Sequence, residues 1–297
     1  MILYQTLPLF KAKVIKRPSA SIKSPYVADI LLVDDNNEPL DDVLYLAHSP
    51  SLGCCGLADK DAYVMVSKSN NPKTKTDYVI ELSCFYETKK EINYLEYVSL
   101  KPKIAEKVAH QALLQNGVPG IPQFKSLNPE KKFKHSRFDF YGIDQFDQEH
   151  IIEIKTVPLA YYVDVPKKEY KNYQEIINNS NFNDKIAYFP DGYRKNINEP
   201  VSPRALKHIQ ELEEIALEGK IKCTLLFVIQ RSDICCFQPS NLDKIYKKAV
   251  QKAWINGVQI KTIVMKWNEL GEGILFKTDL PIHLFEFNGP FVIEDLN

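Results

Sequence analysis

An unbroken apolar run, CTLLFVI at residues 223–229, constrains the fold of this 297-residue chain more than any other stretch. A strand without polar alternation is typical of a position buried on both faces of a sheet. An amphipathic helix is predicted before it, at 202–219, and another after it, at 240–257, which leads to the strand-like VQIKTIVM at 258–265. This alternation of strands and helices predicts a partly parallel, right-handed α/β layer.

The second part of the chain, residues 99–297, is predicted to be one α/β domain with a mixed sheet and flanking helices. Its first helix is expected at 102–117, where a proline opens the segment and an Asn-Gly pair closes it. Two strands are expected at about 136–141 and 150–157. The stretch 161–185 has weak periodicity and many Tyr, Asn and Lys residues, so we expect a partly helical surface insertion.

Residues 1–98 show a different pattern, in which short strand-like segments rich in β-branched and aromatic residues alternate with turn-forming stretches such as DDNNEPLDD. The expected strands lie at 11–17, 27–33, 42–49, 62–69 and 78–86. Five short strands predict a small all-β barrel of the OB type. Such barrels often bind single-stranded nucleic acid, but fold alone does not establish function.

Composition narrows the class of protein. Lys+Arg and Asp+Glu are equal at 38, which argues against a protein that coats DNA without specificity, although a neutral total can contain a basic groove beside an acidic site. The six cysteines match neither zinc-ligand spacing nor a disulfide framework. The N-terminus lacks a signal-peptide pattern, and no apolar run is long enough to span a membrane. We therefore expect a cytoplasmic protein with reduced thiols and no membrane contact.

The stretch SRFDFYGIDQFDQEHIIEIKTV carries the candidate chemistry. Strand alternation predicts that Phe138 and Phe140 point to one face and Asp139 to the other. On the next strand Glu153 and Lys155 share a face. Pairing the two polar faces would therefore bring Asp139, Glu153 and Lys155 together.

Two carboxylates can hold Mg²⁺, and a nearby ammonium can orient an attacking water and offset charge on a phosphate. The alternative is a solvent-facing hairpin with an ordinary salt bridge, because Glu-x-Lys pairs are common on strands. The apolar residues around the charges, Ile151, Ile152, Ile154 and Val157, indicate instead a central strand. Charges on such a strand are costly unless they are paired or bind a metal.

Five motifs in order carry a resemblance to a known family. They are SRFDF, IIEIKTVPLA (151–160), AYFPDG (187–192), SPRALKHIQEL (202–212) and CTLLFVIQR (223–231). This series, over about residues 98–285, resembles the sugar fermentation stimulation protein A (SfsA) family. The resemblance implies an OB-type barrel followed by a nuclease domain of the PD-(D/E)XK superfamily. It implies a DNA or RNA nuclease that uses Mg²⁺ or Mn²⁺, or alternatively a non-catalytic DNA-binding regulator.

By this resemblance Asp139 and Glu153 would be metal ligands, Lys155 the catalytic lysine and Glu106 a supporting acid. Asp191 of the FPD motif is a candidate third metal ligand, with a turn-forming role as the alternative.

The resemblance also suggests residues that would bind nucleic acid: Arg137, Arg204, Lys207 and Gln230. Arg204 and Lys207 begin a predicted helix, where the helix dipole suits a phosphate, or else they are ordinary exposed charges. Arg137 would contact a phosphate or pair with Glu153. The long 161–185 segment departs from the family pattern and suggests an added lid or substrate-contacting arm.

Overall fold

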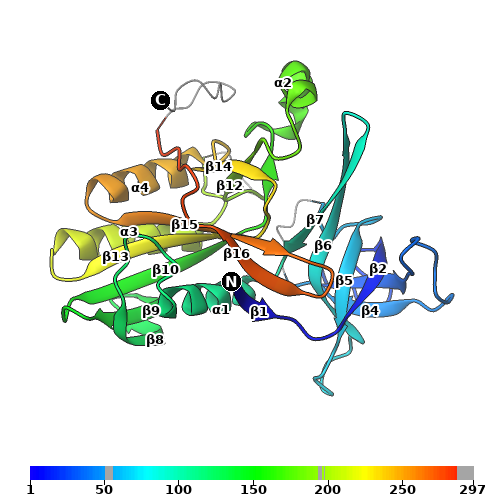
Figure 1. Cartoon of the computed structure of the whole chain (residues 1–297), viewed down its shortest axis with the longest axis horizontal. Helices are drawn as coiled ribbons and strands as arrows, with labels where there is room; N and C mark the ends of the chain where they lie inside the picture. Colours follow the sequence, from blue (N-terminus) through cyan, green and yellow to red (C-terminus); the bar gives the residue numbers. More distant parts are fainter. Residues whose placement is uncertain (51–55, 193–195, 197, 286–297) are drawn as a thin grey trace.

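A computed structural model describes residues 1–50, 56–192, 196 and 198–285, and it places a large α/β body beside a smaller barrel (Figure 1). The body is built on a seven-stranded sheet. Its strands, in spatial order, are β1 (Ile2–Gln5), β16 (Glu272–Lys277), β15 (Gln259–Trp267), β13 (Lys222–Ile229), β10 (Glu149–Val157), β9 (Ser136–Asp144) and β8 (Phe124–Phe133). The central strands β10, β13 and β15 are parallel and the outer ones antiparallel, which confirms the predicted mixed α/β sheet.

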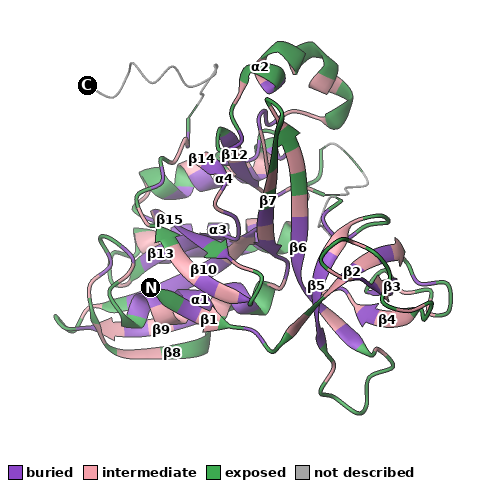
Figure 2. Ribbon diagram, turned by 45° about the vertical axis from the view of Figure 1, so that its right-hand side comes forward, coloured by how far each residue is buried: buried purple, intermediate pink, exposed green. Residues whose placement is uncertain are grey.

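Helices cover both faces of this sheet. Helix α1 (Pro102–Leu114) packs on one face, and α3 (Pro203–Leu217) and α4 (Lys244–Ile255) pack on the other. The side chains of strand β13 alternate between the two helical layers. Leu226 and Val228 pack with α1, whereas Leu225 and Phe227 pack with α3 and α4. All four side chains are fully buried, as the apolar run predicts (Figure 2).

Side-chain caps mark the N-termini of α3 and α4, and a glycine follows the C-terminus of α4. The Ser202 hydroxyl accepts a hydrogen bond from the Ala205 amide at 3.3 Å and caps α3. Asp243 caps α4 in the same way, accepting from the Tyr246 amide at 3.0 Å. Gly257 follows α4 with a φ of 97°, a conformation that favours glycine and ends the helix.

The smaller unit is a closed sheet. Its strands lie in the order β4 (Tyr45–His48), β3 (Val27–Leu32), β2 (Leu9–Lys16), β5 (Tyr63–Lys68), β6 (Tyr78–Lys89) and β7 (Ile92–Ser99). A parallel pairing between β4 and β6 closes the first five into a small barrel. The five expected strands are all present, and β7 was not predicted from the sequence. It forms a long hairpin with β6 that projects from the barrel.

Strand β1 corrects the expected boundary of the first domain. It pairs with β16 at the edge of the large sheet rather than joining the barrel that follows it in sequence. Leu3 of this strand is buried in the core cluster on the α1 side. Burial of this side chain and the added strand pairing hold the N-terminus on the α/β body, so the barrel begins only at β2.

The 161–185 segment is an elaboration of a third, three-stranded sheet. This sheet contains β11 (Ala160–Tyr161), β12 (Lys185–Phe189) and β14 (Ile234–Pro239), and a 3₁₀-helix (Lys167–Tyr173) and α2 (Gln174–Asn179) lie between β11 and β12. Tyr94 on the β6–β7 hairpin stacks on Phe182 at 4.3 Å, and Lys90 donates to Asn181 at 2.8 Å. The segment therefore rests against the barrel hairpin (Figures 1 and 2).

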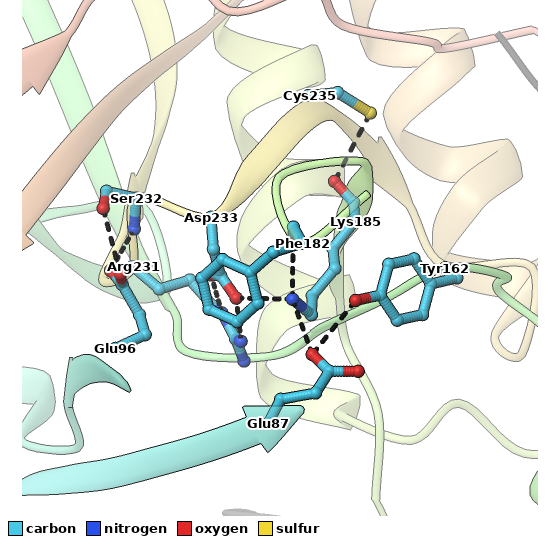
Figure 3. Close-up of polar contacts among 9 residues, drawn as sticks. All are labelled: Glu87, Glu96, Tyr162, Phe182, Lys185, Arg231, Ser232, Asp233 and Cys235. Atoms are coloured by element: carbon cyan, nitrogen blue, oxygen red, sulfur yellow. Dashed lines mark hydrogen bonds and ion pairs between the residues drawn. The ribbon is translucent and has the colours of Figure 1, made fainter. Parts of the chain in front are cut away.

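A buried group of charges joins these parts, and we call it the junction cluster: Lys185, Asp233, Arg231, Glu87 and Glu96 (Figure 3). Lys185 lies 2.9 Å from a carboxylate oxygen of Glu87 and 2.9 Å from one of Asp233. Arg231 donates two hydrogen bonds of 2.6 Å to Asp233, and Glu96 accepts from the backbone and side chain of the intervening serine. The barrel, the insertion and the α/β body thus meet at one set of ion pairs.

The described cysteines, Cys84, Cys223, Cys235 and Cys236, carry free thiols. Cys54 and Cys55 lie outside the described residues. Among the helices that the structure describes, none is long and apolar enough to cross a membrane.

Candidate active site

Strand β10 places two of the predicted catalytic side chains on the face covered by α3. Ile152 and Ile154 pack with α1, so the alternate residues Glu153 and Lys155 point to the opposite side. Glu153 is only 2% exposed, and Lys155 forms an ion pair with its Oε1 atom. His208 of α3 contacts the same oxygen through its Nδ1 atom. Glu153 is thus buried and Lys155 largely shielded from solvent, so the alternative of a solvent-facing salt bridge is wrong.

Asp139 reaches this site from β9 by a route that strand alternation does not predict. The pairing of β9 with β10 ends at Phe140 and Ile152, and beyond that point the Asp139 carboxylate accepts a hydrogen bond of 2.7 Å from the Ile154 amide. Phe138 packs with the α3 side of the core and Phe140 with the α1 side. The two rings therefore contact opposite layers, and the expectation that they share a face is wrong.

Two carboxyl groups, those of Asp139 and Glu153, interact electrostatically in this site. Burial first and the negative charge of Glu153 second raise the pKa of Asp139 to about 7, against the opposing effects of the Ile154 amide and Lys155. Burial also acts to raise the pKa of Glu153, but Lys155 and His208 outweigh it and hold that pKa below its usual value. Near neutral pH the site therefore contains one stable carboxylate and one that readily gains or loses a proton. We call Asp139, Glu153, Lys155 and His208 the catalytic cluster, after the role predicted for the first three.

A divalent cation fits this pair of carboxyl groups. The Oε2 atom of Glu153 is buried and has no hydrogen-bond partner, whereas Oε1 is occupied by Lys155 and His208. A buried acceptor without a partner is costly and calls for a ligand. Mg²⁺ binds through one or two carboxylates and retains several waters, so Asp139 and the free oxygen of Glu153 suffice to hold it.

Asp191 does not join this pair. Among the described residues, no three His, Cys, Asp or Glu side chains come close enough together to hold a metal ion. Asp191 is half-buried after β12 and accepts a hydrogen bond from the Gly192 amide at 2.7 Å. The predicted three-residue ligand set of Asp139, Glu153 and Asp191 is therefore wrong in this structure, and the turn-forming alternative agrees with the contact observed.

Glu106 is half-buried on α1, on the other face of the sheet from Glu153. Its charge contributes to the raised pKa of Asp139, as the smallest of the causes. The structure thus brings Glu106 within electrostatic reach of the site, in the neighbourhood predicted for a supporting acid.

Three of the predicted nucleic-acid-binding residues are at the surface. Arg137 is exposed and pairs with Glu130, so the predicted pairing with Glu153 is wrong. Arg204 and Lys207 are exposed on the first turns of α3, and Lys207 donates to the His135 carbonyl at 3.1 Å. These cations lie on the β9 strand and α3 helix that supply the catalytic cluster.

Gln230 is a core residue, which contradicts its predicted contact with nucleic acid. It is completely buried, and its side-chain oxygen accepts a hydrogen bond of 3.1 Å from the Trp267 indole. The residue directly follows β13, and its Nε2 atom is buried without a hydrogen-bond partner.

The structure adds two residues whose relation to the site was missed. His208, which follows the surface lysine of α3, binds Glu153 directly. Tyr246 of α4 is fully buried with an unpartnered hydroxyl, and its pKa is raised well above its usual value by burial and by the charge of Glu153. The helical spacing of His208 places it on the buried face of α3, but nothing in the sequence pairs it with β10.

Comparisons with known proteins identify the family. The profile described as "Sugar fermentation stimulation protein RE domain" matches residues 103–168 and 161–271, which together are more than half of the chain. A sugar fermentation stimulation protein homolog of Idiomarina loihiensis is 27% identical over 241 residues, which are 80% of this chain and 86% of the relative. One from Clostridium acetobutylicum is 28% identical over 218 residues, 72% of this chain and 77% of the relative.

The fold is similar to a solved structure. The structure of Pyrococcus furiosus SfsA in complex with Ca²⁺ matches with a TM-score of 0.67 and 16% identity, over 95% of this chain and 99% of that one. The match includes the mixed sheet, its helices and the small barrel, since it extends over nearly the whole length of both chains. The profile match, which spans β9, β10 and α3, shows that this chain belongs to the SfsA family.

Proposed function

We propose that this protein is a metal-dependent nuclease that hydrolyses phosphodiester bonds of DNA or RNA with Mg²⁺ or Mn²⁺. The observation that carries the proposal is the unpartnered Oε2 atom of buried Glu153, next to Asp139 and fixed from its other oxygen by Lys155. A second carboxylate, a free ligand atom and an ammonium at one site are the groups that metal-assisted phosphodiester hydrolysis requires.

Asp139 and Glu153 would hold the cation, which supplies Lewis-acid stabilisation of the charge that develops on the phosphate. His208 and Lys155 bind the same oxygen of Glu153 and so keep its other oxygen directed at the site. The Lys155 ammonium orients the attacking water and offsets the charge of the phosphate. Asp139, with a pKa near 7, binds the cation in its deprotonated form.

The relative from Pyrococcus furiosus was solved in complex with Ca²⁺, which supports a divalent-cation site in the family. Ca²⁺ and Mg²⁺ both take oxygen ligands but differ in the geometry that they require. The order Asp139, then Glu153-x-Lys155 on the next strand, with Glu106 on the preceding helix, agrees with the PD-(D/E)XK superfamily. Asp139 and Glu153 lie on two strands that pair with each other, and Glu106 lies on the helix before them. This arrangement supports the superfamily assignment.

The nucleic acid would be held by the exposed cations near the site and by the barrel. Arg137, Arg204 and Lys207 supply positive charge on β9 and α3. The barrel has the strand order β4-β3-β2-β5-β6, closed by a parallel pairing of β4 with β6. This five-stranded closed arrangement supports an OB-type assignment, and such barrels bind oligonucleotides.

The test is a cleavage assay on labelled single- and double-stranded DNA and RNA, with Mg²⁺, Mn²⁺ or EDTA. We expect cleavage with Mg²⁺ or Mn²⁺ and none with EDTA, and we expect its loss in Glu153→Gln and Lys155→Ala. Glu149→Gln, an exposed carboxylate on the same strand, is the matched control and should remain active. Cleavage that survives both cluster substitutions would show that another site, or a contaminant, cuts the substrate.

The rival function is that of a non-catalytic DNA-binding regulator. It would be favoured by tight binding of nucleic acid without cleavage under any of the metal conditions. The pairing of half-buried Asp139 with buried Glu153 argues against it, because a surface that only binds phosphate gains nothing from carboxylates beside it.

A further inference from the structure

Two tyrosines and two lysines lie together on the outer face of the barrel, and we call them the tyrosine–lysine patch: Lys11, Lys13, Tyr63 and Tyr86. Lys13 on β2 is directly opposite Tyr63 on β5, and Tyr63 is opposite Cys84, two residues before Tyr86 on β6. Opposite residues and residues two apart share a face, so all four side chains point outward together.

The rings and ammonium groups are in mutual contact. The two tyrosine rings have centroids 5.9 Å apart in an edge-to-face arrangement. The Lys11 ammonium lies 5.8 Å from both ring centroids, and that of Lys13 lies 5.8 Å from the Tyr63 ring. Lysines over aromatic rings are electrostatically attracted to them, so the patch holds two positive charges against two flat apolar surfaces.

The patch is accessible. Tyr86 is 44% exposed, and the other three side chains are half-buried. A hollow of about 390 Å³ lies beside the rings and is also lined by Asn37 and Asp61. Lys13 pairs with Asp61 at 3.5 Å, but that carboxylate is mostly exposed, and exposed ion pairs contribute little. The lysine is thus able to exchange this partner for a phosphate.

We propose that the tyrosine–lysine patch binds single-stranded nucleic acid, with bases stacked on Tyr63 and Tyr86 and phosphates against Lys11 and Lys13. Every base has a flat face that can stack on an aromatic ring, so such a platform accepts any sequence. A duplex keeps its bases stacked internally and can offer this patch only its phosphates. The inference rests on the proposed nuclease function, because it assigns a single strand as the preferred substrate.

A second cation–aromatic pair lies on the α1 side of the large sheet. Tyr63 packs against the core cluster that contains α1. On the α1 side, the Lys107 ammonium lies 5.5 Å from the Tyr4 ring centroid, at a second hollow of about 430 Å³. Glu106 and Phe140, the residue after the catalytic aspartate, also line this hollow. A second cation–aromatic pair therefore lies on the α1 side of the molecule, beside the predicted supporting acid Glu106.

The test is a binding measurement in EDTA, where cleavage cannot occur. Fluorescence anisotropy would compare labelled single-stranded DNA and RNA of mixed sequence with a duplex of the same sequence. The double variant Tyr63→Ala/Tyr86→Ala should lose single-strand affinity by roughly tenfold or more per ring, and duplex affinity should change much less. Tyr63→Phe/Tyr86→Phe keeps both rings and should bind a single strand as the wild type does.

A matched control is Tyr26→Ala, which removes another exposed ring of the barrel that stacks on His48. It should leave single-strand affinity unchanged. Lys11→Ala/Lys13→Ala should make the dependence of log affinity on log salt concentration shallower by about 0.7 for each lost phosphate contact. The thermal midpoint of each variant shows whether it is folded.

A folded double alanine variant that binds a single strand as tightly as wild type would overturn the proposal. So would an equal loss of single-strand and duplex affinity. These outcomes are distinct from failure of the nuclease function. If wild type binds through the patch but never cleaves with Mg²⁺ or Mn²⁺, the nuclease proposal fails and the patch stands. If Glu153→Gln abolishes cleavage while the tyrosine variants bind normally, the patch fails alone.

Discussion

Two buried groups of charges in this protein differ in how completely the chain satisfies them. In the junction cluster each acid has its partners within the chain: Lys185 and Arg231 bind Asp233, and no unpartnered side-chain atom is found among its described residues. In the catalytic cluster, Glu153 has one oxygen bound twice and the other not at all.

This difference distinguishes the junction cluster, which stabilises the fold, from the catalytic cluster, which is proposed to bind a ligand. A closed network of buried ion pairs can hold parts of a fold together, and removing one member leaves an uncompensated charge. A buried oxygen without a partner weakens the fold unless a ligand or an ordered water supplies the missing contact. The two groups should therefore respond oppositely to substitution: the first in stability and the second in activity and metal binding.

The largest expected effect is on catalysis. Glu153→Gln removes the anionic ligand atom while keeping the shape of the side chain, and it should lower the cleavage rate on the order of 10³-fold. Initial rates with Mg²⁺ measure this. Glu149→Gln, on the same strand but exposed, should remain within about twofold. A Glu153→Gln variant with normal rates would remove the distinction between the two clusters.

In the junction cluster we expect a loss of stability instead. Asp233→Ala leaves Lys185 and Arg231 buried without their shared anion, and should lower the free energy of unfolding by about 3–5 kcal/mol. Urea unfolding measures this. Glu175→Ala removes an exposed acid of α2 and should stay within about 0.5 kcal/mol of wild type. Equal stability of both variants would show that the junction cluster does not hold the parts together.

A pH dependence of stability is expected from Asp139. Its pKa in the folded protein is about 7, well above its ordinary value of 3.8. Between these values the folded protein keeps a proton that the unfolded chain has released, so the free energy of unfolding falls as pH rises from about 4 to 7. Relative to Asp139→Asn, metal-free wild type should lose up to roughly 4 kcal/mol across this range. Urea unfolding in EDTA at several pH values tests it, and parallel pH profiles would contradict it.

The smallest effect that we predict is stabilisation by the metal itself. A ligand that binds only the folded state at 100 times its Kd adds about 2.7 kcal/mol. Mg²⁺ should thus raise the thermal midpoint of wild type and of Asp233→Ala, because the catalytic cluster is intact in both. It should leave Glu153→Gln unchanged. A Mg²⁺-dependent rise in Glu153→Gln would place the cation somewhere other than the catalytic cluster.

Local patterns were sufficient to predict most of the elements. The five barrel strands, the three long helices and the apolar strand β13 agree with residue periodicity and with caps such as Ser202. The strands that were not predicted are β1, β7, β8, β11, β12, β14 and β16. Strand β1, for example, owes its position to pairing with β16, more than 260 residues later. A short segment held by a distant partner has no signal of its own.

The sequence by itself determined the residue types of the candidate catalytic site and their order: an aspartate on one strand, then Glu153 and Lys155 at strand spacing on the next. It also determined the two-sided burial of β13, because an unbroken apolar run can only be satisfied between two layers. These properties depend on neighbours in the chain, which periodicity can detect.

The tertiary structure alone decided how those residues meet. The opening of the β9–β10 ladder turns Asp139 toward the Ile154 amide, and α3 brings His208 to Glu153 across 55 positions of sequence. Packing also buries Gln230 against Trp267, where it was predicted to contact nucleic acid. Which charges are satisfied and which are left open depends on contacts between distant segments, and those contacts exist only once the layers have packed.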